Sequence, residues 1–226
     1  MDFSFLPKYY KFYLYGARTT LLLAVFTVFF GVIIGVFFAL MKISKNRLLR
    51  FIAAAYIEFI RGTPLMVQLF IIYYGMPQIG IRFPSFNFMG SDFADLMPCI
   101  ITLSINSGAY VAEIIRAGIQ AIDKGQMEAA RSLGLTHTMA MQHVILPQAF
   151  KNILPALGNE FIVVIKESSI VSLIGIAELM YNTDTIRGNT FNAVAPLIIA
   201  ALMYFVMTFT LSKFLGVAER RMRASD

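Results

Sequence analysis

The chain has few of the residues from which catalytic and metal sites are built. Its 226 residues include one cysteine, two histidines and no tryptophan. The single Cys99 excludes an intramolecular disulfide and any site with several cysteine ligands. His137 and His143 lie six residues apart in a polar segment, and no histidine, cysteine and carboxylate residues have the spacing of metal ligands. The sequence therefore predicts neither a catalytic residue nor a metal site.

Charge is also scarce, because charged residues make up 14% of the chain and hydrophobic residues 58%. A soluble domain is nearer a quarter charged and half apolar. The apolar residues occur in runs long enough to cross a bilayer, which takes roughly 20 residues as a helix. The phosphate-binding motif GxxxxGK(S/T) does not occur, so the chain cannot bind ATP in that way. These features predict an integral membrane protein that is not an enzyme.

The apolar runs predict an all-α membrane protein with five transmembrane helices in one domain, residues 1–226. The runs are continuous rather than alternating, which favours helices over barrel strands. The first run is too long for a cleaved signal peptide and is expected to stay as a span. Gly31 and Gly35 form a small-xxx-small pair that predicts close helix packing. The spans are expected at about residues 16–41, 48–74, 96–119, 154–179 and 193–217.

Lysine and arginine positions predict the orientation of the chain in the membrane. Most of the 19 basic residues flank the connections after the first and third spans or follow the fifth span. We therefore interpret the net charge of +6 as a topology signal and expect no nucleic acid partner. The N-terminus is expected outside, the C-terminus in the cytoplasm, and residues 120–153 in a cytoplasmic loop.

Several polar side chains fall within the expected spans, where a charge costs at least about 2.5–3.5 kcal/mol unless it faces protein or water. The pairs Glu58/Arg61 and Glu113/Arg116 have i,i+3 spacing and could neutralise each other. The fourth span carries two acids and one base, more than one helix pair needs. Either these groups join helices, or they line a cavity for a small zwitterionic or cationic solute. The candidates for such a path are Glu58, Arg61, Asn106, Ser107, Tyr110, Glu160, Lys166 and Glu167.

The polar loop between the third and fourth spans is expected to form two short helices. The first would end at Gly134, a residue suited to a left-handed C-cap. The second would begin after Thr136 as N-cap and would end before Pro147. Ala129 and Ala130 leave one face without large side chains, so another surface could approach closely. A membrane protein with such a projection is expected to be held there by a partner.

The residues of this loop carry a family resemblance. Glu128-Ala129-Ala130-x-x-x-Gly134, then nine residues, then Val144-x-Leu146-Pro147, resembles the EAA loop of ABC importer permeases. The usual Ile is replaced by Val144, a conservative departure. Further motifs resemble the polar amino acid permeases for histidine, arginine, glutamine and cystine: Arg61-Gly62-Thr63-Pro64-Leu65 with Gln68, Ala109-Tyr110-x-x-Glu113-x-x-Arg116-x-Gly118, Pro147-Gln148-Ala149 and Lys166-Glu167-Ser168-Ser169.

The resemblance implies a MetI-like type I ABC importer permease in a bacterial inner or plasma membrane. Its partners would be two ABC ATPase subunits, a second permease copy or paralogue, and an extracytoplasmic amino acid-binding protein. The ATP and Mg²⁺ would bind to the ATPase, so the chain itself would hold no cofactor. Alternating access would pass a cationic or zwitterionic amino acid inward. Contact with the ATPase would use Glu128, Ala129, Ala130, Gly134, Leu146 and Pro147.

Two other functions are weighed against the permease. An ion-coupled secondary transporter would need internal symmetry and a site for the coupling ion, and the sequence has no detectable repeat. A non-transporting membrane scaffold would keep the docking loop but would not need the polar groups within the spans.

Overall fold

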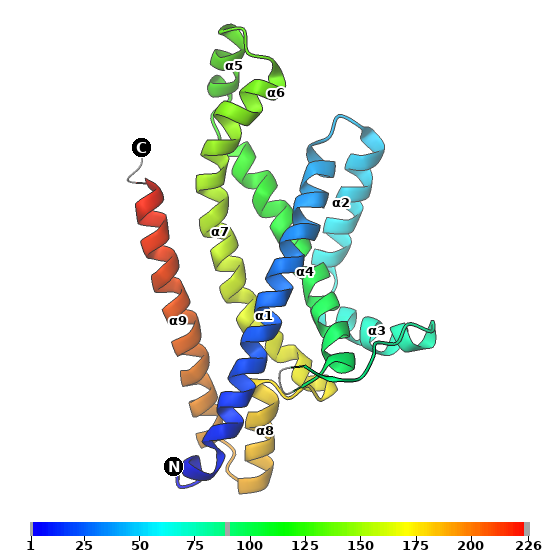
Figure 1. The fold of residues 1–226 in the computed structure, drawn as a ribbon, viewed down its shortest axis with the longest axis vertical. Coiled ribbons are helices and arrows are strands. Elements are labelled where there is room, and N and C mark those ends of the chain that lie inside the picture. The colour runs from blue at the N-terminus through cyan, green and yellow to red at the C-terminus, as the bar shows by residue number, and fades with distance from the viewer. Residues whose placement is uncertain (1, 89–90, 224–226) are drawn as a thin grey trace.

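The computed structural model describes residues 2–88 and 91–223, most of which are helical (Figure 1). Long helices run side by side along the molecule, and α3 crosses their direction. The elements in chain order are α1 (Leu6–Ile43), α2 (Arg47–Gly62), α3 (Leu65–Gln78), β1 (Asn87–Phe88), β2 (Ser91–Asp92), α4 (Phe93–Gln120), α5 (Lys124–Ser132), α6 (His137–Ala140), the π-helical turn η1 (Met141–Ile145), α7 (Leu146–Glu167), the 3-10 helix η2 (Ser168–Ile174), α8 (Leu179–Thr190) and α9 (Ala195–Arg223).

Helix α1 is the central element of the fold. Its 38 residues span about 57 Å at 1.5 Å per residue, more than the roughly 30 Å of a bilayer core. The buried apolar clusters of the described residues each include α1, through Tyr13, Leu23, Ala24 and Ala39 in turn. These clusters join α1 to α2, α3, α4, α7, α8 and α9, so the other helices are arranged around it.

Small residues bring α1 and α4 close together. A Cβ atom on Gly31 would lie 3.1 Å from the Ser107 Cβ, and one on Gly35 would lie 2.4 Å from the Val111 Cγ1. Such distances leave no room for a side chain at Gly35. The predicted role of this glycine pair in close helix packing is confirmed.

The expected second span is not one helix. Helix α2 ends at Gly62, α3 begins at Leu65, and their axes differ in direction by 103°. Pro64 disfavours helical backbone at the preceding residue, and Thr63 is extended with φ −115° and ψ 144°. The bend turns α3 sideways, so that it extends out from the long helices (Figure 1). The continuous helix expected over residues 48–74 is therefore wrong.

The expected fourth span also differs from the structure. The α-helical part, α7, ends at Glu167, and the chain tightens into η2 before Gly175 reverses it with φ +89°. Helix α8 then starts at Leu179 and lies beside the beginning of α1. The single helix expected over residues 154–179 is therefore wrong, because it joined three separate elements.

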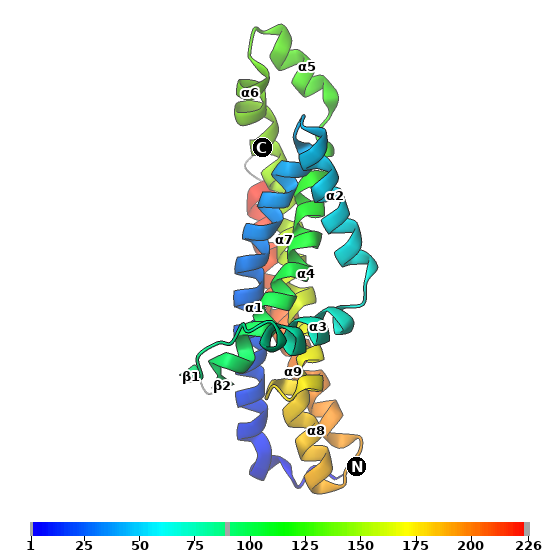
Figure 2. The ribbon, with the colours of Figure 1, turned by 90° about the vertical axis from the view of Figure 1, so that its right-hand side faces the viewer.

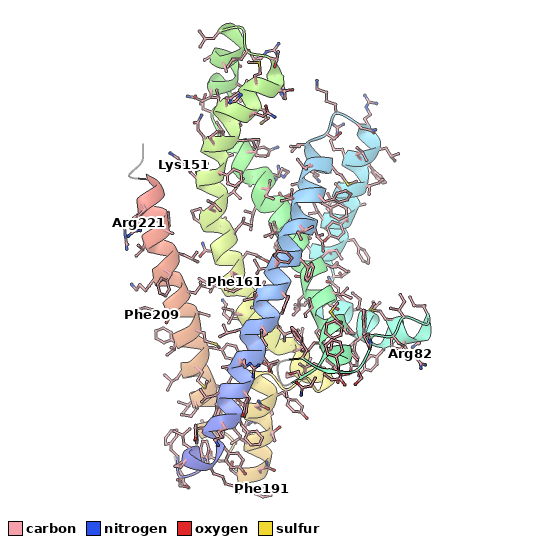
Figure 3. The ribbon with its side chains drawn as sticks, viewed as in Figure 1. Arg82, Lys151, Phe161, Phe191, Phe209 and Arg221 are labelled. Atoms are coloured by element: carbon pink, nitrogen blue, oxygen red, sulfur yellow. The ribbon has the colours of Figure 1, made fainter. Side chains whose placement is uncertain are left out.

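Apolarity alone identifies fewer spans than five. Among the described residues, α1, α4 and α9 are long and apolar enough to cross a membrane, and the bent α2–α3 pair would add a fourth. Helix α7 does not qualify, because its charged residues and asparagines lower its mean hydropathy. The outward side chain of Phe209 on α9 is typical of a lipid-facing surface (Figure 3).

The two ends of the molecule differ in structure. Helices α5 and α6 project beyond the bundle at one end, whereas α8 and the N-terminus lie at the other (Figure 2). A small antiparallel pair, β1–β2, precedes α4, and the Asp92 carboxylate caps that helix by accepting from the Ala94 N–H at 2.9 Å. A hydrogen bond from the Ser85 hydroxyl is the main cause that holds the pKa of Asp92 below its usual value.

Candidate solute path and coupling loop

A buried carboxylate joins α4 and α7. Glu160 is 8% exposed, and its Oε1 accepts a hydrogen bond of 2.8 Å from the Ser107 hydroxyl. One turn earlier on α4, the buried Ser104 hydroxyl has no hydrogen-bond partner among the described residues. Two of the predicted path residues are thus brought into contact. The carboxylate keeps a second oxygen for which the structure gives no hydrogen bond within the described chain, so it can accept a further donor.

Asn106 belongs to a different contact, which holds the bend between α2 and α3. Its side-chain amide donates to the Gln68 Oε1 at 3.1 Å. The Gln68 amide in turn donates to the Ile60 carbonyl at 2.7 Å and to the Thr63 hydroxyl at 2.8 Å. The Ile60 carbonyl lies at the end of α2, where the helix supplies no donor. Asn106 therefore supports the broken helix through Gln68.

Glu58 and Arg61 do not form the ion pair that their spacing allows. Both side chains are exposed, and the described residues contain no ion pair between them. The Arg61 guanidinium lies instead over the ring of Tyr110, 5.4 Å from its centroid, which is within the range of a cation–π contact. Of the two roles left open for these residues, mutual neutralisation is therefore absent, and Arg61 turns toward α4.

The second expected pair is present. The Arg116 Nε lies 3.0 Å from each carboxylate oxygen of Glu113, and its other nitrogens contact Glu113 and Gln120. This pair satisfies both charges near the end of α4, as the i,i+3 spacing predicts.

The remaining predicted path residues lie at the end of α7. Lys166 is exposed, and Glu167 is half-buried. Glu167 lies on the same stripe of the helix as Glu160, about 10 Å further along its axis. No hydrogen bond in the described chain connects Lys166 to the other path residues. Asn106, Ser107 and Tyr110 all lie on α4, and they contact α3, α7 and α2 respectively. Lys166 takes part in none of these contacts.

The coupling loop has the predicted C-cap. Gly134 has φ +87°, its N–H donates to the Arg131 carbonyl, and the Leu135 N–H donates to the Ala130 carbonyl. These two bonds form a Schellman motif, which ends α5 and turns the chain toward α6. Thr136 then caps α6, since its hydroxyl accepts from the Met139 N–H at 3.3 Å.

The second helix of the loop does not end before Pro147. It passes through the π-turn η1 into α7, in which Pro147 occupies the first turn. The π-turn η1 comes directly before the proline, and its last bond runs from the Leu146 N–H to the Met141 carbonyl. The wider turn accommodates Pro147, which has no N–H to donate to the helix. The loop is therefore continuous with α7 rather than separated from it.

Only part of the expected docking surface is accessible. Glu128, Ala129 and Gly134 are exposed at the projecting end of the molecule, and so is Pro147 at the start of α7. Ala130 is 4% exposed and packs inward, and Leu146 is half-buried. The bare face is thus formed by Ala129 and its exposed neighbours, without Ala130.

Sequence reasoning missed a second buried acid, Glu178. It has no exposed surface, and its carboxylate accepts from the Tyr181 N–H at 2.7 Å, the Tyr204 hydroxyl at 3.0 Å and the Thr20 hydroxyl at 3.3 Å. These contacts link α1, α8 and α9 and cap α8. A lone acid after the apolar run Ile174-Gly175-Ile176-Ala177 was a usable signal, but the long expected span concealed it.

Comparisons with known proteins identify the class to which this fold belongs. The family model of binding-protein-dependent transport system inner membrane components matches residues 31–224. The chain belongs to this family. It is the permease subunit of an ABC transporter, a membrane component whose ATPase is a separate subunit.

Relatives and solved structures place the chain among the amino acid permeases of this family. A putative glutamine transport system permease from Rickettsia bellii is 44% identical, with 98% of this chain and 97% of the relative covered. The arginine transport system permease of Bacillus subtilis is 43% identical, with coverage of 100% and 99%. A solved amino acid ABC transporter crystallised with histidines is 52% identical, has a TM-score of 0.89 and aligns over 98% of this chain and 99% of its own.

A second solved structure, the methionine ABC transporter in an inward-facing conformation, has a TM-score of 0.77 at 18% identity. It aligns with 98% of this chain and 99% of its own, and it supports the MetI-like helical fold. None of these comparisons favours an ion-coupled transporter or a scaffold.

Proposed function

We propose that this permease carries a polar amino acid, cationic or zwitterionic, past Glu160. The observation that carries the proposal is the buried carboxylate on the seam between α4 and α7, with the Ser107 hydroxyl on one oxygen. A carboxylate at this depth attracts the ammonium group that every amino acid has, and it favours a cationic side chain further. The names of the relatives, which include glutamine and arginine permeases, support the same class of solute.

A second permease, either a copy of this chain or a paralogue, completes the path. Glu58, Arg61 and Lys166 are exposed on helices that otherwise carry many exposed apolar residues. Charges facing lipid are costly, so they are expected to face protein or a water-filled passage. A partner permease that covers these three residues would provide both a protein surface and a wall of the passage. The path would then be lined by residues of two chains.

The energy for transport enters at the projecting loop. The exposed Glu128, Ala129 and Gly134 would contact one of two ATPase subunits, with Leu146 and Pro147 at the base of the contact and Ala130 packed beneath it. Because the loop continues through η1 into α7, a displacement there is transmitted along the helix that carries Glu160. The loop and the C-terminus are then cytoplasmic and the N-terminus is outside, where a binding protein would deliver the amino acid.

The test is ATP-driven uptake in proteoliposomes that contain the permease, its ATPase and its binding protein. Radiolabelled arginine, histidine and glutamine would be supplied without an ion gradient. We expect Glu160→Gln to lower uptake efficiency by about tenfold to a hundredfold, since hydrogen bonds to a charged group are worth about 1.5–3 kcal/mol.

Asp184→Asn is the matched control, because it neutralises an exposed acid that pairs with Arg187 on α8. It is expected to leave uptake unchanged. Uptake by Glu160→Gln with the original affinity and rate would rule out a role of Glu160 in the path. Uptake that needs an ion gradient and no ATP would contradict the importer itself.

A further inference from the structure

The turn between α1 and α2 gathers positive charge without any acid. Lys42, Lys45, Arg47 and Arg50 lie within nine residues, and the sequence has no Asp or Glu between Asp2 and Glu58. The last three of these basic residues, which we call the basic turn, are exposed, and the described chain contains no ion pair that involves them. Lys42 is half-buried and interacts electrostatically with Glu113.

Exposed apolar side chains begin directly beside the basic turn. On α2, Leu48 is 65% exposed and Phe51 is 71% exposed, and on α1 Leu40 is 60% exposed. Phe51 follows Arg47 by four residues, so the two side chains are neighbours on the surface of the helix. A cationic patch thus stands at the end of α1 and α2, directly beside exposed apolar side chains.

The stability of α2 does not account for these charges. The first turn of α2 contains no acidic residue, and cations near a helix N-terminus oppose the helix dipole. A topology signal accounts for the number of these charges and for their place beside a span. It leaves them without an acidic partner in the described chain, where exposed apolar side chains begin. In a chain that spans a membrane, such a boundary lies at the depth of the lipid headgroups.

We propose that the basic turn binds the headgroup of an anionic phospholipid, whose acyl chains lie along Leu48 and Phe51. The charge of the turn is complementary to the lipid phosphate, and the exposed side chains of Leu48 and Phe51 offer an apolar surface to the acyl chains. Basic clusters next to a membrane span are attracted to anionic lipid, with a contribution from each residue near the surface. This binding depends on the membrane position of the chain and not on the solute that it carries.

The test uses the full chain in nanodiscs of phosphatidylcholine with 30% phosphatidylglycerol, followed by native mass spectrometry of the lipids that stay bound. The triple variant Lys45→Gln/Arg47→Gln/Arg50→Gln is expected to retain at least tenfold less phosphatidylglycerol. The charge-preserving variant Lys45→Arg/Arg47→Lys/Arg50→Lys is expected to retain it as the parent does. Both variants are checked for unchanged helical content by circular dichroism.

The matched control, Lys8→Gln/Lys11→Gln/Arg82→Gln, removes three exposed cations elsewhere and is expected to leave retention unchanged. Equal retention by the basic-turn variant and the parent would overturn the proposal. An equal loss in the control would also overturn it, since it would assign the lipid to overall charge. If the basic-turn variant keeps the lipid but loses the ATPase during purification, the turn is a protein contact and the proposal fails.

Discussion

Glu178 and Glu160 are acids at helix contacts within the described chain, and their partners distinguish them. Three donors from three helices surround Glu178, whereas Glu160 has one donor and a free oxygen. A fully satisfied buried acid rigidifies the helices around it, and a partly satisfied one can receive a ligand. The first is therefore structural and the second is suited to the path.

Glu178→Ala is expected to destabilise the chain by about 2–4 kcal/mol. The substitution leaves buried donors on Tyr181 and Tyr204 unsatisfied, each of which costs about 1–3 kcal/mol, and it removes the cap of α8. Unfolding can be followed by a thiol-reactive dye, because Cys99 is the single cysteine and has no exposed surface. A melting temperature equal to that of the exposed control Glu58→Ala would contradict the structural role.

A polar contact could be predicted from the sequence where both partners lie on one helix and no group on another helix competes. The Glu113–Arg116 pair follows from i,i+3 spacing alone. The contacts of Glu160, Gln68 and Glu178 join segments far apart in the chain, so spacing gives no information about them. Arg61 shows the limit, because a ring on another helix competes with the acid that shares its own face.

At the scale of elements, the close packing of α1 against α4 requires glycine where no side chain fits. Gly35→Val is expected to destabilise the chain by at least about 1–3 kcal/mol, since the new Cβ would overlap Val111. Gly75→Ala is the control, because a Cβ added there would meet no packed neighbour within 4 Å, and alanine favours helix by about 0.5–1 kcal/mol. The Cys99 dye assay measures both. Equal melting temperatures would contradict the close approach of these helices.

The bend of α2 and α3 depends on Gln68 as well as on Pro64. A straight helix would place residues 48 and 74 about 39 Å apart, and the bend shortens this distance. Spin labels at Leu48→Cys and Tyr74→Cys in a Cys99→Ala background can measure it. We expect Gln68→Leu to broaden the distance distribution, because the Ile60 carbonyl loses the Gln68 amide, the shorter of its two side-chain donors. The control Gln142→Leu, at an exposed position on η1, is expected to keep one narrow distance. The same narrow distance in both variants would exclude the role of Gln68.

Elements were predicted from the sequence where one signal dominates. The range of α4 and the Gly134 cap agree with apolar length and with the turn chemistry of glycine. The break at Thr63 and the passage through Pro147 were not predicted, although both involve proline. Pro64 disfavours helical backbone at Thr63 and ends α2, whereas Pro147 is accommodated by the π-turn η1 that precedes it. The apolarity of the surrounding sequence does not distinguish Pro64 from Pro147.

At the scale of the whole molecule, the polar contacts of α4 and α7 lie between two structurally different ends. The loop of α5 and α6 projects at one end, and α8 meets the start of α1 at the other (Figure 2). The helix α7 connects the loop directly to Glu160. In the proposed function, this continuity would carry a movement of the loop, driven by an ATPase on another chain, to the path at Glu160.

The exposed charge of Lys166 on α7 leads to one further expectation about the whole assembly. If a second permease covers Lys166, then Lys166→Cys, exposed in the single chain, is expected to react with a thiol reagent more slowly in the assembled complex than in the isolated subunit. Phe191→Cys, at a position that is 96% exposed and points away from the bundle in Figure 3, is the matched control. Equal rates for Lys166→Cys in both states would contradict the placement of the partner.

The measurement that tests the central claim most directly compares Ala129→Arg with Ala193→Arg in ATP-driven amino acid uptake. Both substitutions place the same charge on an exposed alanine, one on the projecting loop and one at the opposite end. We predict that Ala129→Arg loses copurification of the ATPase and lowers uptake at least tenfold, whereas Ala193→Arg keeps both. Full uptake by Ala129→Arg, with the ATPase still bound, would contradict the account.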